Sequence, residues 1–326
     1  MAVKALPRRV LQIGVGVLAL VVAGAVLYGE RGQLSGTTKV LASATLGLVV
    51  VGFGLEVLSD VSYALMTYYL LPARLANITR RWFLGASLAA IAMNDSIPLG
   101  AGFSVAYLYR KLRGRGCSVL EATAALLAGN LLAIVALLVL LGIVLVAHTQ
   151  ATSVLSGVDI VILLLLLLLA AGAIVRIDRF LVLAFWAASR VRSLLHMEVE
   201  TTRENRRLAG EMRFSRPALL KSSFGALGNW LFDLATLVLS LVAVHAHVGL
   251  IGVTAAYVLG ALAANLPITP GGLGVVEGSI TVALVAFGGA PSAMFAAVLL
   301  YRLVSFWIWI PIGWISYFVL GGLRER

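Results

Sequence analysis

The sequence predicts an all-α polytopic membrane protein with two inverted repeats, each containing a broken or re-entrant helical hairpin. Three observations predict this class. Of the 326 residues, 61% are hydrophobic and only 12% are charged, and the mean hydropathy is +1.03. Apolar runs of bilayer-spanning length recur along the chain. Two of these runs are interrupted by proline and glycine at corresponding places. A soluble globular domain is therefore excluded.

The apolar runs mark the expected membrane segments, because a helix of about 20 residues crosses a hydrocarbon core roughly 30 Å thick. The first run follows three basic residues and has no small-residue cleavage site, so we expect a retained helix and not a removed signal peptide. In chain order the runs are 10–28, 40–71, 82–109, 120–147, 158–175, 217–244, 250–287 and 292–320.

Two runs are interrupted by helix-breaking residues, at 94–102 and at 267–274. The apolar arms beside these breaks have roughly 9 to 17 residues, which is too short or barely long enough to span a bilayer. We therefore expect re-entrant hairpins, which enter and leave by one face and are shielded by other helices or a wet cavity. Two complete short spans in place of each hairpin would give the same sidedness and remain an alternative.

The basic residues fix the orientation. With the N-terminus in the cytoplasm, all of the 25 Lys and Arg residues except Arg31, Lys39 and Arg302 fall on the cytoplasmic side. Cytoplasmic loops carry this excess of positive charge, and the opposite orientation would reverse it. The net charge of +11 is thus explained by membrane topology without nucleic-acid binding. We expect the cytoplasmic membrane of a bacterium or archaeon, with both termini in the cytoplasm.

An internal repeat is visible around the two breaks. Asp60 precedes a Pro-x-Gly-x-Gly run that starts at Pro98, and Asp233 precedes a matching run that starts at Pro270. The acids are 173 residues apart and the prolines 172. The span at 158–175 would invert the second copy relative to the first, as in many transporters; chance similarity in a glycine-rich chain is the alternative. We divide a single membrane domain, 1–326, into an N-terminal helix at 1–36, a first repeat at 37–148, a linking span and cytoplasmic connector at 149–212, and a second repeat at 213–321.

Three ionisable residues lie inside predicted spans of the second repeat: Asp233, Glu277 and Arg302. A charge at the bilayer centre costs about 2.5 to 3.5 kcal/mol on insertion scales, so these side chains should face one another or a wet cavity. We expect Arg302 to pair with one of the two acids. Asp60 and Glu56, one helical turn apart, are the counterpart in the first repeat. A purely structural ion pair that holds the hairpin in place is the alternative.

The second break itself favours a functional role. Its glycines allow close backbone approach, and a half-helix starting at Gly272 would direct unpaired amide groups and a positive dipole end toward mid-membrane. Such a site predicts a phosphate ligand. The alternative is that the prolines only form hairpin turns. The candidate substrate-binding or transport residues are Asp233, Glu277, Arg302, Pro270, Gly271, Gly272, Gly274, Trp230, Asn265, Asp60, Glu56 and Pro98.

Three stretches carry a family resemblance: the run from Asn229 to Asp233, the run Pro270-Gly271-Gly272-Leu273-Gly274-Val275-Val276-Glu277, and the run from Leu300 to Trp307. They resemble the transmembrane family named for lysylphosphatidylglycerol synthase, which is related to the lipid-flippase half of the bacterial multiple peptide resistance factor. The likeness extends from about residue 40 to residue 320. The soluble aminoacyl-transferase domain of the two-part members is absent, so the resemblance implies lipid translocation and not lipid synthesis.

The sequence lacks the residue patterns that the main classes of membrane enzyme would require. We find no carboxylate cluster for a metal-dependent transferase and no partnered serine or histidine for hydrolysis or acyl transfer. We therefore expect no enzyme, no catalytic residue, no metal and no cofactor. The expected partner is a membrane lipid with a phosphate-containing headgroup, whereas a homo-oligomer or a lipid-biosynthesis partner stays open. The alternative function is a non-catalytic accessory or scaffold subunit of a complex that makes membrane lipid or cell envelope.

Overall fold

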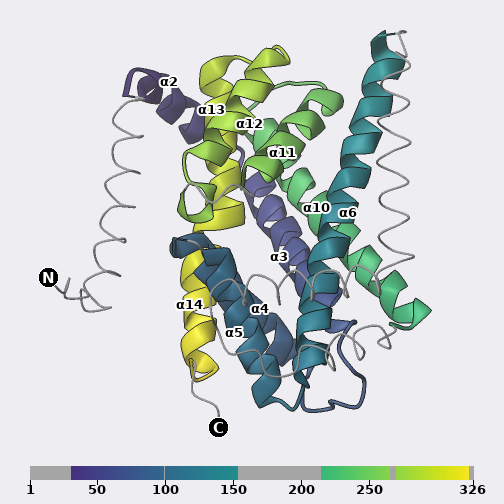
Figure 1. The fold of residues 1–326 in the computed structure, drawn as a ribbon. Coiled ribbons are helices and arrows are strands. Elements are labelled where there is room, and N and C mark those ends of the chain that lie inside the picture. Colours follow the sequence, from purple (N-terminus) through teal and green to yellow (C-terminus); the bar gives the residue numbers. More distant parts are fainter. Residues whose placement is uncertain (1–30, 99, 153–213, 265–268, 323–326) are drawn as a thin grey trace, which may run out of the picture. The chain divides into compact units, whose positions relative to one another are not determined.

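The computed structural model describes residues 31–98, 100–152, 214–264 and 269–322, and all regular structure within them is helical (Figure 1). The predicted segments at 10–28 and 158–175 lie outside these residues. The helices are α2 (Arg31–Ala42), α3 (Leu46–Tyr68), α4 (Arg80–Ser96), α5 (Gly100–Gly114), α6 (Val119–Thr152), α10 (Arg216–Ala243), α11 (Leu250–Ala264), the 3₁₀ turn η1 (Pro270–Gly272), α12 (Val275–Ala286), α13 (Pro291–Arg302), the π-helical turn η2 (Leu303–Trp307) and α14 (Trp309–Val319).

Long apolar helices identify the described chain as a polytopic membrane protein. Four helical runs are long and apolar enough to cross a bilayer: Leu46–Tyr68, Val119–Val144, Arg216–Ala243 and Pro291–Val319. The remaining apolar helices are shorter. The predicted class of an all-α membrane protein is therefore confirmed at this level.

The predicted run at 40–71 is not one helix, which corrects the sequence-based expectation. The chain leaves the helical path between α2 and α3, where the Ser43 hydroxyl donates to the Val40 carbonyl at 2.8 Å. The Thr45 amide then donates to the Ala243 carbonyl of α10 at 2.9 Å. Because a short hydroxyl side chain competes for the last helical carbonyls, the helix can end without proline or glycine.

The two predicted breaks do interrupt helices, and each joins a pair of short ones. α4 and α5 have 17 and 15 residues, and α11 and α12 have 15 and 12. At 1.5 Å per residue these helices are only about 18 to 25 Å long, which is less than the roughly 30 Å hydrocarbon core. None of the four helices therefore spans the core on its own.

Both pairs are folded back as hairpins. At the outer ends of α4 and α5, the Asn77 amide donates to the Arg115 carbonyl at 3.1 Å, and the Arg115 guanidinium lies 4.3 Å from the centre of the Trp82 ring. α11 and α12 lie side by side (Figure 1), and a Cβ on Gly252 near the start of α11 would meet the Phe287 ring just past the end of α12 at 2.7 Å. Each hairpin thus returns to the end from which it started.

The described chain forms two compact units, each discontinuous in sequence. Unit 1 comprises 31–56, 88–104 and 234–316, and unit 2 comprises 57–87, 105–233 and 317–322, apart from the undescribed residues within these ranges. Both units draw on both predicted repeats. In unit 1, α10 and α3 are joined by the Thr236 hydroxyl, which donates to the Gly52 carbonyl at 3.3 Å. The Trp314 indole donates to the Ser96 hydroxyl at 3.1 Å.

Unit 2 packs α3, α6 and α10 around small residues. Its buried cluster includes Met66 of α3 and Leu131 and Leu132 of α6. A Cβ on Gly225 would lie 2.9 Å from the Ser62 carbonyl oxygen, so α10 and α3 approach closely at this glycine. The Trp230 indole donates to the Ala133 carbonyl at 2.8 Å and fixes α10 against α6.

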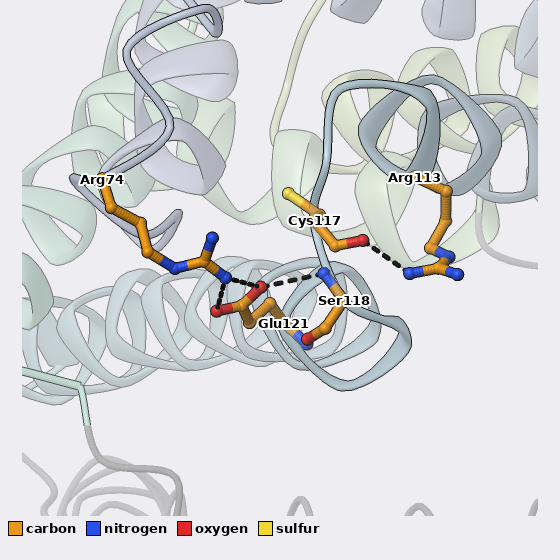
Figure 2. A network of polar contacts seen from close by, with 5 residues as sticks. All are labelled: Arg74, Arg113, Cys117, Ser118 and Glu121. Carbon is orange, nitrogen blue, oxygen red and sulfur yellow. Dashed lines mark hydrogen bonds and ion pairs between the residues drawn. The ribbon is translucent and has the colours of Figure 1, made fainter.

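A polar network in unit 2 holds the start of α6 (Figure 2). Ser118 caps the helix: its hydroxyl accepts from the Glu121 amide at 3.2 Å, while the Glu121 carboxylate accepts from the Ser118 amide at 2.8 Å. Arg74 donates to both oxygens of the same carboxylate, at 2.6 and 2.7 Å. Arg113 donates to the Cys117 carbonyl at 2.6 Å. The loop after α3 is thereby tied to the connection between α5 and α6.

Candidate functional site

The second break is built from glycines in the left-handed region of backbone conformation. Gly271, Gly272 and Gly274 have φ values of 56°, 70° and 81°. Other residue types rarely adopt these angles, which explains the glycine density of this segment. The sequence-based expectation of a half-helix starting at Gly272 was wrong. The three glycines turn the chain first, and α12 begins at Val275 with Gly274 as its N-cap.

Glu277 closes the N-terminus of its own helix. Its Oε2 accepts the Gly274 amide at 2.7 Å, from the third position of α12. A carboxylate there is also favourably placed for the helix dipole. The Gly274 amide, one of those expected to bind a ligand, therefore donates to Glu277 instead.

Arg302 joins this acid to the glycine turn. Its Nε donates to Glu277 Oε1 at 2.7 Å, and its Nη2 donates to the Gly271 carbonyl at 2.9 Å. Only 7% of Arg302 and 8% of Glu277 is exposed. The structure thus pairs Arg302 with Glu277. Breaking such a buried pair by removing one partner is costly, because the remaining charge stays buried without compensation.

The guanidinium keeps donors beyond these two bonds. Arginine carries five N–H groups, and the described contacts use one on Nε and one on Nη2. Its flat face lies 3.9 Å from the centre of the Phe306 ring, an arrangement that shields the cation while leaving its edge available. The remaining N–H groups have no hydrogen-bond acceptor among the described residues.

The first break lies against the second. A Cβ on Gly271 would stand 2.9 Å from the carbonyl oxygen of Asp95, so the two interrupted segments meet backbone to backbone. The Asp95 carboxylate also attracts Arg302 electrostatically. Sequence reasoning placed Asp95 in the break but gave it no role. No sequence signal distinguishes it from other polar residues of a turn.

Phe306 was also missed, although its spacing held a signal. It lies four residues after Arg302, the distance that brings side chains together on one helix face. Phe306 lies within the π-helical turn η2, which directly follows Arg302. Such turns are rare and frequently occur at functional sites.

The other candidate residues are distributed as follows. Pro270 begins η1, Pro98 lies half-buried in the first break, and Glu56 is 4% exposed on α3 of unit 1. Asn265 lies outside the described residues. Asp60, Trp230 and Asp233 belong to unit 2, and the Trp230 indole is engaged with α6. Gly271, Gly274, Glu277 and Arg302 therefore form the cluster that the structure assembles in unit 1.

Comparison with known proteins agrees with this description. The family described as "Lysylphosphatidylglycerol synthase TM region" matches residues 10–313. One curated relative, a "UPF0104 membrane protein" of the archaeon Methanothermobacter thermautotrophicus, is 32% identical over 79 residues. That segment covers 24% of this chain and 23% of the relative, so the match spans about a quarter of the relative's length.

Proposed function

This chain belongs to the lysylphosphatidylglycerol synthase TM region family, and on that premise we propose that it is a flippase-type transporter. Its cargo is a phosphate-containing lipid, either a phospholipid or a polyprenyl-linked lipid, moved between the leaflets of the cytoplasmic membrane. The observation that carries the proposal is the buried Arg302–Glu277 pair on the glycine turn of the second break. The excess of basic residues supports cytoplasmic termini.

The order of helix lengths supports two repeats. Each half has a long helix, two short helices folded as a hairpin, and a second long helical run: α3, α4, α5 and α6, then α10, α11, α12 and α13 to α14. In transporters with inverted repeats, broken helices from both halves meet at the substrate site. The contact between Gly271 and Asp95 supports this arrangement here.

We assign the lipid phosphate to the free edge of Arg302. A guanidinium binds phosphate oxygens through paired N–H groups, and Arg302 has three N–H groups beyond those that hold Glu277 and Gly271. The phosphate can therefore bind without first breaking the ion pair. Glu277 keeps the guanidinium in position, and Glu56, which belongs to the same unit, provides a further acidic group for a cationic headgroup or a proton. No covalent step is needed, so the proposed activity is transport and not catalysis.

Reconstitution tests this proposal. The full chain is placed in proteoliposomes with fluorescent phospholipids and a labelled polyprenyl phosphate, and translocation is followed by quenching of the label in the outer leaflet. We expect Arg302→Ala to reduce the rate about tenfold or more, as loss of a charge-assisted contact of about 1.5 to 3 kcal/mol implies. Glu277→Gln should reduce it less, because the amide oxygen still accepts from Arg302.

A matched control comes from the ion pair of Arg74 and Glu121. Arg74→Ala and Glu121→Gln remove the same groups from the α6 cap and should leave translocation unchanged. Equal rates for wild type and Arg302→Ala would remove Arg302 from the mechanism. A wild-type protein that moves no lipid of the panel would contradict transport and support the accessory or scaffold function.

A further inference from the structure

A cavity of about 750 Å³ opens in unit 2, away from the buried ion pair. It lies where α3 ends, and it is bounded by the loop at 69–79, the start of α4 and the start of α10. Its walls combine the aromatic residues Tyr68 and Tyr69 with the basic residues Arg80, Arg81 and Lys221. Aromatic and basic side chains together are typical of the membrane–water interface.

The cavity concentrates positive charge. Arg80, Arg81 and Lys221 are exposed, and none of the described residues that line the cavity is acidic. Arg80 and Lys221 both contact the ring of Tyr69, at 5.8 and 5.5 Å from its centre. Two cations on one ring repel each other, and a bound anion converts that repulsion into attraction.

Two neighbouring basic residues, Arg74 and Arg115, already have partners within the protein. Arg74 is neutralised by Glu121 at 2.6 Å, and Arg115 donates to the Asn77 carbonyl and stacks on Trp82. These two bases serve the fold. Arg80, Arg81 and Lys221 have no carboxylate partner among the described residues, so they remain available to a ligand.

An apolar groove of about 170 Å³ adjoins the charged cavity. The two share Tyr68, Arg80 and Arg81, and the groove continues between α3 and α4 along Leu65 and Leu84. A charged pocket that runs directly into an apolar groove matches a molecule with an anionic head and a hydrocarbon tail. A free anion has no hydrocarbon tail and would leave the groove empty.

We infer that this is a binding site for an anionic phospholipid. The headgroup phosphate lies among Arg80, Arg81 and Lys221, and the first part of one acyl chain lies in the groove beside Leu65 and Leu84. The site lies in unit 2 and does not depend on the transport proposed for unit 1. On the orientation that the basic residues predict, it draws its lipid from the cytoplasmic leaflet, which is rich in anionic lipid.

Native mass spectrometry of the full chain in detergent tests the inference. Dioleoyl phosphatidylglycerol and dioleoyl phosphatidylcholine are titrated separately, and bound lipid is counted. We expect the wild type to bind phosphatidylglycerol about tenfold more tightly. The double variant Arg80→Gln/Lys221→Gln should lose roughly tenfold or more in phosphatidylglycerol affinity, since each base near anionic lipid contributes about fivefold. The control Arg110→Gln/Arg216→Gln removes the same charge from exposed positions outside the cavity and should match the wild type.

Two further arms separate a lipid from free phosphate. Leu84→Trp fills the groove and should weaken phosphatidylglycerol binding several-fold, and Leu65→Trp tests the opposite wall if the first variant does not fold. Inorganic phosphate is then added at about 10 mM, which is about ten thousand times the Kd of a ligand that binds with micromolar affinity. It should displace little lipid, because free phosphate does not occupy the apolar groove. Displacement by phosphate together with full binding by both tryptophan variants would overturn the lipid assignment. Equal binding by Arg80→Gln/Lys221→Gln and its control would overturn the site.

Discussion

The ring of Phe306 occupies the space that a side chain on Gly271 would need. A Cβ built on Gly271 collides with the ring, and the φ of 56° already disfavours any other residue. Phe306 also covers the guanidinium that donates to the Gly271 carbonyl. The aromatic ring, the glycine turn and the buried cation are therefore one packed assembly.

Gly271→Ala should destabilise the protein through this assembly. We expect a loss of about 1 to 3 kcal/mol in the free energy of unfolding, from the left-handed backbone and the overpacked ring. Denaturant unfolding in detergent micelles measures it. Gly278→Ala is the control, because that glycine is exposed on α12 with no neighbour within 4 Å of a Cβ. Similar stability of the two variants would show that the break tolerates a side chain.

A double-mutant cycle should find strong coupling between Arg302 and Glu277. Arg302→Met alone leaves a buried carboxylate unpaired, which costs about 3 to 5 kcal/mol, whereas Arg302→Met/Glu277→Gln leaves no charge behind. The double variant should thus be more stable than Arg302→Met. The same cycle on Arg74 and Glu121 should give less than about 1 kcal/mol, because the Arg74 side chain is 59% exposed. Equal coupling in the two cycles would contradict the burial of the first pair.

Gly225→Leu should separate α10 from α3. A Cβ at Gly225 meets the Ser62 carbonyl oxygen and the Met66 backbone at 2.9 and 3.0 Å, and backbone cannot rotate away as a side chain can. We expect a loss of about 1 to 3 kcal/mol and a lower thermal midpoint in detergent. Gly54→Leu on α3 meets nothing within 4 Å and should be neutral or slightly stabilising. The idea fails if Gly54→Leu is the more damaging change.

Cys117 should resist alkylation in the folded protein. Burial, and then the nearby Glu121 carboxylate, raise its pKa to about 11, and only 1% of the residue is exposed. A raised pKa keeps the thiol protonated, so at pH 8 the thiolate fraction is about 0.1%, against about a quarter for a free thiol. Iodoacetamide labelling followed by intact mass should be at least about a hundredfold slower than in the unfolded chain.

The sign of the Cys117 effect can be tested separately. Glu121→Gln removes the negative charge that raises the pKa of the Cys117 thiol, so labelling should become faster at every pH between 7 and 9. Ser118→Ala keeps that charge and should change the rate less. Slower labelling of Glu121→Gln would contradict the electrostatic explanation.

Much of the fold follows from the sequence because bilayer thickness imposes a length on apolar helices. The run predicted at 217–244 became α10 at Arg216–Ala243, and both Pro/Gly breaks interrupt helices. The division between α2 and α3 was missed because it has no proline or glycine. It depends on a tertiary bond from Thr45 to Ala243, which a local pattern does not contain.

The candidate site was predicted in composition but not in connectivity. The cost of buried charge identified Arg302 and two acids, whereas the choice of Glu277 depends on its position three residues after the N-cap glycine. The predicted start of α12 was wrong because the sequence does not show that these glycines adopt a positive φ, which delays the helix to Val275. Arg80 and Lys221 indicated only topology in the sequence, since their meeting at Tyr69 joins segments about 140 residues apart.

The π-helical turn after Arg302 sets the direction in which side chains on either side of it point around the helix axis. Such a turn holds one residue more than an α-helical turn, and the surplus residue can pass to the neighbouring turn without unwinding the helix. A shift of the wide turn past Arg302 would swing this side chain by about 100° around the axis, while Trp309 and Gly313 beyond it keep their packing. The wide turn lies directly after Arg302, so it is the point of the last helix at which such a rotation would begin.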